Sequence, residues 1–408
     1  MTIRDNLLTL WLAAAVLSAV ACRNDDVAGP ADPVSDLQPA PLLVSGAAQA
    51  LSLRQVSAGN THTCGVTAGN RAYCWGNNEP GPYGDASGAL GDGTTTSRVK
   101  PVRVRRGLLF RAVSTGTQNT CGVTTDNVAY CWGYNAFGPL GDGTMTTRLT
   151  PVRVKGGLQF RTVRSSAGHT CGLTTTDLAY CWGYNGNGQL GDGTTTHRLE
   201  PVAVLGGRRF RALIVGAYHT CGLTTSSRVL CWGDNSYGQV GDGSIAQQRL
   251  RPVMVSGGRS FRQVSAGFRH TCAVTTGSRA FCWGYGGFGQ VGDGKTLVRR
   301  TPRAVVGGLS FERLTLGFYH TCGETTNHRA YCWGYNFHGQ LGDGTTSLRL
   351  TPGAVAGLRF RLLSAGKEHT CGVTTGDVTY CWGWNESGQL GDGTTTDRLR
   401  PVAVAGPS

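Results

Sequence analysis

The chain has 408 residues, of which 63 are glycine and only 15% are charged, and this composition argues against long helices with a charged, solvent-facing side. The formal net charge of +14 would suit an acidic partner. However, thirteen of the 38 Lys and Arg residues recur at fixed places in a repeat, and no single basic stripe stands out along the chain. Nucleic acid is therefore not the expected partner.

The amino terminus has the features of a secretory signal peptide. Arg4 precedes an apolar run from Leu7 to Val20, and small residues precede Cys22. The run is short for a transmembrane helix, and a charged start, an apolar run and a small-residue cleavage site together define such a signal. We expect residues 1–21 to be removed and the mature protein to lie outside the cytoplasm.

Cys22 is the expected site of a lipid anchor. Seven internal pairs account for all the other cysteines, and the segment before Cys22 resembles a bacterial lipoprotein signal. Residues 22–50 are rich in Pro, Asp and Ala and are interpreted as a flexible tether. Lipidation would place the protein in a bacterial envelope, attached to the membrane only through the anchor. Ordinary cleavage would instead leave a free thiol and a secreted protein.

One pattern returns seven times after residue 50. It first appears as "HTCGVTAGNRAYCWG" from His62, and the first cysteines of the copies stand at positions 64, 121, 171, 221, 272, 322 and 371. Each unit contains four short segments in which apolar residues alternate with small or polar ones, a pattern typical of strands joined by turns. The chain is therefore predicted to be all-β, a seven-bladed β-propeller of four-stranded blades over residues 51–404.

The ends of the repeat region suggest how the ring closes. No Pro-Val-x-Val segment directly precedes Leu51, whereas the chain ends with Pro401-Val402-Ala403-Val404. We expect this carboxyl-terminal strand to complete the first blade, which leaves no open sheet edge. The segment from Pro41 to Val44 is the competing candidate for that place.

The run "HTCGVTTGDVTYCWGWNESGQLGDG" resembles the repeat of the regulator of chromosome condensation family, and the resemblance covers roughly residues 51–404. It implies a seven-bladed propeller. The chain departs from the usual repeat by placing cysteines at two flanking strand positions. The best-known family member exchanges guanine nucleotide on a nuclear GTPase, and some similar secreted propellers, including a β-lactamase inhibitor, bind a protein through aromatic loops of one face.

The paired cysteines are expected to form a disulfide within each blade. In an antiparallel hairpin that pairs Cys121 with Cys131, directly opposed residues approach to within disulfide range. Reduced core cysteines and metal ligands are the alternatives, but the ten-residue spacing lacks the close pairs of zinc sites, and an exported chain meets oxidants. The predicted pairs are Cys64 with Cys74, Cys121 with Cys131, Cys171 with Cys181, Cys221 with Cys231, Cys272 with Cys282, Cys322 with Cys332, and Cys371 with Cys381.

Other recurring residues are interpreted as structural. Each Gly-Asp-Gly turn, such as that of Asp92, offers one carboxylate, too few for calcium, and we expect no metal and no cofactor. The arginine that stands three residues before each Pro-Val-x-Val proline, such as Arg98, can pair with this aspartate. The histidine before each Thr-Cys, such as His62, is expected to bond a loop backbone, because asparagine replaces it in the second unit. The tryptophans, such as Trp75, are expected to pack between blades.

The variable loops contain the candidate binding site. If the strands of a blade alternate in direction, the connection before each histidine and the loop after each Cys-Trp-Gly emerge on one face of the disc. In the fourth to sixth units these loops carry aromatic residues and an arginine, the composition of a protein-binding hot spot. The alternative is that these rings only cap the blade ends. The candidate residues are Tyr218, Tyr237, Phe268, Arg269, Phe288, Phe318, Tyr319, Phe337 and His338.

The sequence favours a binding module over an enzyme. No Ser-His-Asp or Cys-His set, carboxylate pair or phosphate loop stands outside the repeated framework. We expect a monomer that binds a protein or an envelope polymer through one loop face. The alternatives are nucleotide exchange, implied by the family resemblance, an inhibitor-type propeller, and a purely structural surface protein.

Overall fold

The computed structural model describes residues 51–80 and 87–407. The expected signal peptide, the tether, Cys22 and the candidate strand from Pro41 to Val44 lie outside these residues. Within them all the regular elements are strands, β1 to β27, and no helix in this part of the chain is long and apolar enough to cross a membrane.

The first blade is an antiparallel sheet of four strands that follow one another in the sequence. It contains β1 (Gln55–Ala58), β2 (His62–Val66), β3 (Ala72–Gly76) and β4 (Arg98–Arg103). The second and third blades contain β5 (Phe110–Thr115), β6 (Asn119–Thr124), β7 (Ala129–Gly133), β8 (Arg148–Arg153), β9 (Phe160–Ser165), β10 (His169–Thr174), β11 (Ala179–Gly183) and β12 (Arg198–Ala203). The fourth blade contains β13 (Phe210–Val215), β14 (His219–Thr224), β15 (Val229–Asp234) and β16 (Gln248–Met254).

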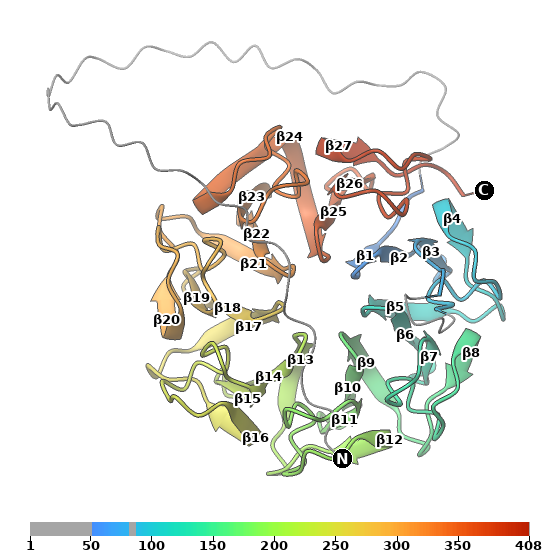
Figure 1. Cartoon of the computed structure of the whole chain (residues 1–408), viewed down its shortest axis with the longest axis horizontal. Coiled ribbons are helices and arrows are strands. Elements are labelled where there is room, and N and C mark those ends of the chain that lie inside the picture. Colours follow the sequence, from blue (N-terminus) through green and yellow to red (C-terminus); the bar gives the residue numbers. More distant parts are fainter. Residues whose placement is uncertain (1–50, 81–86, 408) are drawn as a thin grey trace, which may run out of the picture. The chain divides into compact units, whose positions relative to one another are not determined.

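The remaining three blades continue the same order around the ring, with the first strand of each blade near the axis (Figure 1). They contain β17 (Phe261–Ala266), β18 (His270–Thr275), β19 (Ala280–Gly284), β20 (Arg299–Ala304), β21 (Phe311–Leu316), β22 (His320–Thr325), β23 (Arg329–Gly334), β24 (Arg349–Ala365), β25 (His369–Thr374), β26 (Thr379–Gly383) and β27 (Arg398–Ala403). The long strand β24 is the outer strand of the sixth blade and the inner strand of the seventh, so these two blades share hydrogen bonds in one seven-stranded sheet.

The prediction that the carboxyl-terminal strand completes the first blade is wrong. Val402 in β27 lies opposite Cys381 in the seventh blade, and the first blade takes its fourth strand from its own repeat, where Val102 lies opposite Cys74. The reason is local: the loop after the third strand folds back, and the pair of Asp92 with Arg98 fixes the fourth strand to that loop. Each blade is thus built from one stretch of chain.

The first and seventh blades meet through side-chain packing and hydrogen bonds. Leu53 and Trp75 share a buried cluster with Val373 and Leu390. The Lys367 amide donates to the Gly59 carbonyl at 3.0 Å. The same kinds of contact join the other neighbouring blades, as in the cluster that surrounds Trp132 between the first and second blades. Burial of apolar area between blades therefore stabilises the whole ring.

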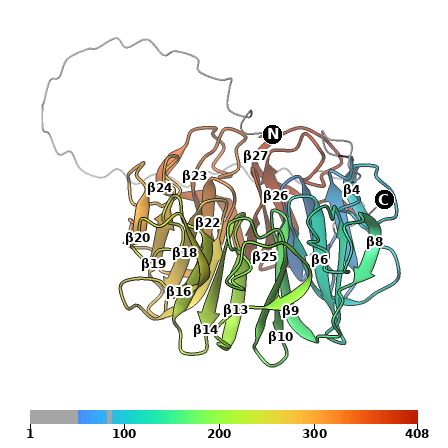
Figure 2. The same ribbon diagram turned by 60° about the horizontal axis from the view of Figure 1, so that its bottom comes forward.

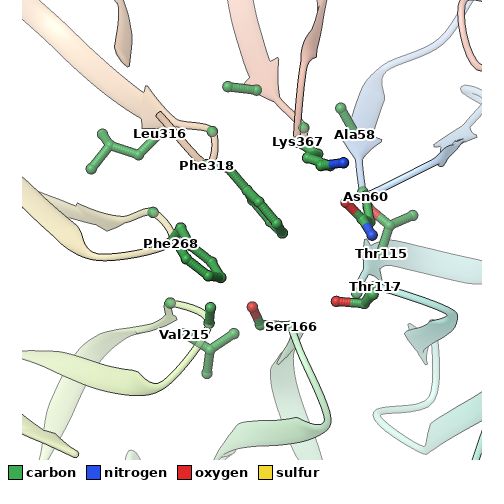
Figure 3. Close-up of a pocket in the computed structure, with 18 of the residues that line it drawn as sticks. Ala58, Asn60, Thr115, Thr117, Ser166, Val215, Phe268, Leu316, Phe318 and Lys367 are labelled. Carbon is green, nitrogen blue, oxygen red and sulfur yellow. The ribbon is translucent and has the colours of Figure 1, made fainter. Parts of the chain in front are cut away.

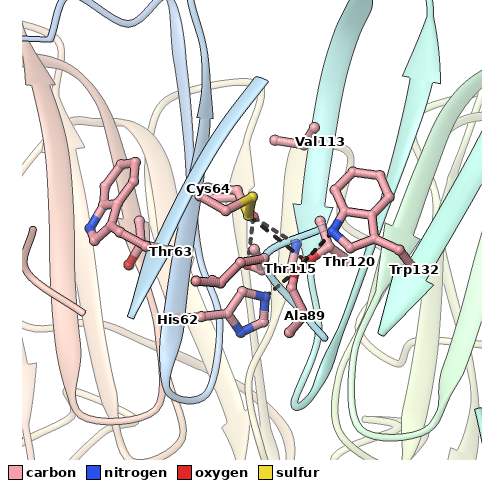
Figure 4. Close-up of a disulfide and its surroundings, with 12 residues drawn as sticks. His62, Thr63, Cys64, Ala89, Val113, Thr115, Thr120 and Trp132 are labelled. Carbon is pink, nitrogen blue, oxygen red and sulfur yellow. Dashed lines mark hydrogen bonds between the residues drawn. A yellow bond between two sulfur atoms is a disulfide. The ribbon is translucent and has the colours of Figure 1, made fainter. Parts of the chain in front are cut away.

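A histidine, a threonine and a tryptophan form one repeated contact between blades. His62 Nε2 lies 2.9 Å from the Thr120 hydroxyl, which donates to the Ala89 carbonyl at 2.9 Å, and Trp132 Nε1 donates to the same carbonyl (Figure 4). Because the hydroxyl uses its proton on the carbonyl, the histidine must be the Nε2–H donor. The expected tryptophan packing is confirmed, whereas the histidine bonds a hydroxyl of the next blade and not a loop backbone.

These histidines remain neutral. Complete burial removes the imidazolium from water and lowers the pKa of His62 and His219 to about 4. The same desolvation lowers the pKa of His169, His270, His320 and His369 to about 3. They are structural groups at any physiological pH.

The expected disulfides and ion pairs are present. All seven cysteine pairs are bonded within their own blades, with the Cα atoms 4.0 to 4.1 Å apart. Each Gly-Asp-Gly aspartate pairs with the arginine of the fourth strand, as in Asp142 with Arg148 at 2.9 Å. Burial alone would raise the pKa of Asp142, but hydrogen bonds from Thr144 and Arg148 hold it below its usual value.

Candidate binding face

The strand register defines two faces of the disc. In the third blade, His169 at the start of β10 lies opposite Gly183 at the end of β11, whereas Leu173 lies opposite Ala179 at the other edge. We call the edge with the connections from first to second and from third to fourth strands the front face. The turn from second to third strand and the connection to the next blade form the back face. Figure 2 shows the strands running between these two layers of loops.

A cavity of about 120 Å³ opens on the axis of the front face. Its wall is the ring of chain segments that leave the first strands, and these segments are in contact: a Cβ at Gly366 would clash with the Gly59 carbonyl. Beyond this ring, Phe268 and Phe318 line one side of the opening, while Asn60 and Lys367 line the other (Figure 3). The opening therefore has an aromatic side and a polar, cationic side.

Phe268 lies at the centre of the aromatic side. Its ring stacks on Phe318 with the centroids 4.7 Å apart and the planes inclined by 22°. Tyr218 and Tyr319 meet the same ring edge-on, at 5.6 and 5.5 Å. These four residues come from three consecutive blades, and each ring is partly exposed. The fold thus joins positions about fifty residues apart into one surface.

Arg269 places a positive charge against these rings. Its guanidinium lies 4.8 Å from the Tyr237 ring centroid and 5.0 Å from that of Phe268, and it donates to the Tyr237 hydroxyl at 3.1 Å. Cation–π contacts of this kind hold the guanidinium in a fixed place while leaving part of it in reach of solvent. A partner would meet a preorganised cation.

A second row of rings extends outward. Phe288 contacts Tyr319 at 5.1 Å and Tyr335 at 5.2 Å, and Tyr335 contacts Phe337 at 4.6 Å. Tyr285 joins this row to Tyr237 at 5.1 Å. Tyr285 and Tyr335 are absent from the predicted set, because they occupy the repeated position after Cys-Trp-Gly, which looked like framework.

His338 lies at the edge of this surface in a charged group. Its Nδ1 is 2.8 Å from Asp397 and its Nε2 is 3.3 Å from Glu368. Lys367 lies 3.8 Å from Glu368 and 5.1 Å from the ring centroid of Trp384. His338 was predicted as part of an aromatic surface, whereas the structure engages both of its ring nitrogens with carboxylates.

We call the contiguous rings and Arg269 the aromatic patch. The structure brings eight of the nine predicted residues into it and leaves His338 beside it. Its members are Tyr218, Tyr237, Phe268, Arg269, Tyr285, Phe288, Phe318, Tyr319, Tyr335 and Phe337.

The patch offers aromatic rings and neutral hydrogen-bond donors for contact with a partner. Burial raises the pKa of Tyr319 and Tyr335, so both phenols stay neutral and can donate hydrogen bonds. Phe337 is 59% exposed and is the most accessible large ring of the patch. Residues 51–80 and 87–407 contain no group of three His, Cys, Asp or Glu side chains arranged to hold a metal ion.

The fold and repeats define the chain as a seven-bladed β-propeller built from tandem units. Residues 155–408 match the RCC1-like domain. Shorter stretches, residues 53–81, 110–138 and 126–173, match the regulator of chromosome condensation (RCC1) repeat. The chain therefore belongs to the RCC1-like family.

Known relatives share mainly the fold. The ultraviolet-B receptor UVR8 of Arabidopsis thaliana is 29% identical over 89 residues, which cover 21% of this chain and 19% of the receptor. The chain thus matches about a fifth of the length of that relative. Human WBSCR16 is similar at 19% identity with a TM-score of 0.70, covering 79% of this chain and 87% of that one. Prp20p of Saccharomyces cerevisiae, whose structure is described with its binding properties to Gsp1p and histones, is similar at 18% identity with a TM-score of 0.71, covering 87% and 88%.

Proposed function

We propose that this chain is an exported, lipid-anchored, non-enzymatic propeller that binds a protein or an envelope polymer through the aromatic patch. The observation that carries the proposal is the continuity of the patch: rings from three neighbouring blades touch one another around a fixed arginine. Aromatic residues and arginine are the side chains most enriched where binding energy concentrates.

Export is supported by the seven bonded cysteine pairs. Disulfides form and persist in oxidising compartments, and thioredoxin and glutathione keep most cytosolic thiols reduced. Each disulfide also links the two middle strands of its blade, which form a hairpin. Under this proposal Cys22, outside the described residues, holds the disc at the membrane.

The rigidity of the patch favours binding over mere decoration. Tyr237 and Arg269 are held by a hydrogen bond and stacking before any partner arrives, so fewer rotamers are lost on association. If the rings only covered the ends of the blades, those nearest the axis would be enough. The outer row of rings extends beyond them as far as the exposed Phe337.

The test compares two aromatic clusters of the same face. The mature chain and its F268A/F318A/Y319A variant are used to retain partners from an envelope fraction. The matched control is F137A/Y184A, because Phe137 and Tyr184 form an edge-to-face pair at 5.2 Å outside the patch. The proposal expects the triple variant alone to lose the retained partner, with near-ultraviolet circular dichroism outside the substituted rings unchanged. Equal retention by all three proteins would refute it.

A further inference from the structure

The back face gathers positive charge. The turn from second to third strand and the connection between blades each place basic residues there, and a circular array of similar repeats holds equivalent positions at the same height. The two kinds of loop are in contact: Arg209 donates to the Thr176 carbonyl and Arg359 donates to the Asn327 carbonyl. Arginines that look dispersed along the sequence thus share one surface.

One set of back-face arginines is built into the ring. Arg111 donates to the Asn127 side chain at 2.6 Å and to the Arg161 carbonyl of the next blade at 3.2 Å. Arg361 donates in the same way across the closing interface, to the carbonyls of Leu53 and Arg54. Among the described residues, Arg54, Arg111 and Arg211 of this set have no acidic partner and add positive charge around the axis, while their contacts with backbone carbonyls make them poor choices for mutation.

The acids of the back face neutralise only part of its positive charge. Asp177 pairs with Arg161, Glu312 with Arg262, and Asp377 with Arg361, each with one arginine of the ring. Asp126, in the turn of the second blade, interacts with Thr124 and Arg153. Within the described chain, other back-face arginines are exposed and their side chains have no hydrogen bond or ion pair. Six of them are Arg71, Arg103, Arg106, Arg208, Arg279 and Arg329.

The front face differs in one set of arginines. The arginine of each fourth strand pairs with a Gly-Asp-Gly aspartate, as Arg198 does with Asp192 at 2.8 Å. Arg269 remains a front-face cation, but among the described residues the back face has more arginines without an acidic partner.

A hollow in the connection between the first and second blades gathers three arginines. It is lined by Arg103, Val104, Arg105, Arg106 and Gly107. Arg106 has φ of 74°, at the place where the next connection has Gly156 with φ of 92°. A side chain in this left-handed region strains the backbone, whereas glycine adopts it freely. Arg106 lies in this strained conformation beside Arg103 and Arg105, and three neighbouring guanidinium groups form a site that suits an anion.

We propose that the back face adsorbs to an anionic phospholipid membrane, with Arg103, Arg105 and Arg106 contacting lipid phosphates. The inference rests on the proposed export and anchoring. The basic residues are spread around a disc and not along one stripe, which matches a planar array of charges better than a linear polyanion such as DNA. Each basic side chain near an anionic leaflet contributes about 1 kcal/mol, an effect that salt screens within about 10 Å.

Vesicle co-sedimentation tests this proposal. The mature chain, prepared without an acyl group, is mixed with phosphatidylcholine vesicles that contain or lack phosphatidylglycerol. We expect binding only to the anionic vesicles, weakening as salt rises. The R103E/R105E/R106E variant is expected to lose about a hundredfold in affinity or more, from the loss of three favourable contacts.

The matched control changes the net charge equally elsewhere. Lys100, Lys295 and Arg400 are exposed residues on outer strands and front-face loops. The K100E/K295E/R400E variant should keep most of the affinity. Equal losses in both variants, or no binding to anionic vesicles at all, would overturn the proposal. So would binding to double-stranded DNA at the same salt that is as tight as vesicle binding and equally sensitive to the hollow.

The two faces can be tested separately. F268A/F318A/Y319A should bind anionic vesicles normally, and R103E/R105E/R106E should still retain the front-face partner. Failure of vesicle binding with normal partner retention would reject the membrane inference and leave the proposed function intact.

Discussion

His369 in the seventh blade donates a hydrogen bond to Thr63 in the first. The same histidine–threonine bond joins each of the other neighbouring blades in which this histidine is present. The distance from His369 Nε2 to Thr63 Oγ1 is 2.9 Å, against 2.8 to 3.1 Å elsewhere in the ring. The closing interface is therefore built like the internal ones, although its two sides are about three hundred residues apart in sequence.

The first prediction concerns this closure. Thr63→Val keeps the shape of the side chain but leaves the buried His369 donor without a partner, and this should lower the free energy of unfolding by about 1 to 3 kcal/mol. Thr220→Val removes the equivalent hydroxyl between the third and fourth blades. Urea unfolding followed by tryptophan fluorescence should give similar losses. A much smaller loss for Thr63→Val would mean that the ring is not closed in this way.

The blade boundaries could not be predicted, because the sequence of a circular repeat does not show where one blade ends and the next begins. The Pro-Val-x-Val segment can pair forward or backward with equal local propensity, and only tertiary contact decides. The spacing of Cys121 and Cys131 did predict the hairpin register, because a ten-residue separation fixes which residues oppose each other. Local geometry was therefore predictable, whereas the assignment of the fourth strand was not.

The same logic applies to the candidate site. Phe268 and Phe318 were predictable because they differ from the other repeats at a shared loop position. Tyr285 was missed because its position repeats in other blades as Tyr134 and Tyr184. The carboxylate partners of His338 come from the next blade along the chain, so no local pattern could reveal them. The charge of the back face likewise depends on the circular arrangement.

The second prediction concerns the cysteines. The mature chain, denatured and alkylated without reductant, should show no labelling at the fourteen repeat cysteines. Prior reduction should allow label at each of them in mass spectrometry. C371S/C381S should lower the free energy of unfolding by roughly 2 to 3 kcal/mol, because the unfolded chain regains the entropy of a short loop. Fourteen free thiols in the unreduced protein would contradict the structure.

The third prediction concerns a buried carboxyl group. Glu324 is 4% exposed and stands opposite Arg313, where the second blade has Val123 opposite Ala112. Desolvation raises its pKa from 4.5 to about 7, against a lowering effect of Arg313. The folded chain thus binds this proton more tightly than the unfolded chain, and stability should fall as the pH rises from about 4.5 to about 7.

Two variants isolate this group. Glu324→Gln should remove this fall, which is roughly 3 kcal/mol for a shift of this size. Glu324→Val should be more stable than the natural chain above pH 7, since it restores the apolar residue of the other repeats. Chemical denaturation over this pH range provides the comparison. Parallel profiles for the natural chain and Glu324→Gln would show that the carboxyl group does not titrate as described.

The fourth prediction tests the central claim, that the front-face aromatic patch is where a partner binds. A photo-crosslinking amino acid is placed at Phe337, which is 59% exposed in the patch, or at Leu109, which is 46% exposed on the back face. After illumination in the envelope, we expect a discrete adduct from position 337. This adduct should disappear when the F268A/F318A/Y319A substitutions are introduced into the same chain, and position 109 should give no such adduct. The same adduct from both positions, or one from position 337 that survives the triple substitution, would contradict the account.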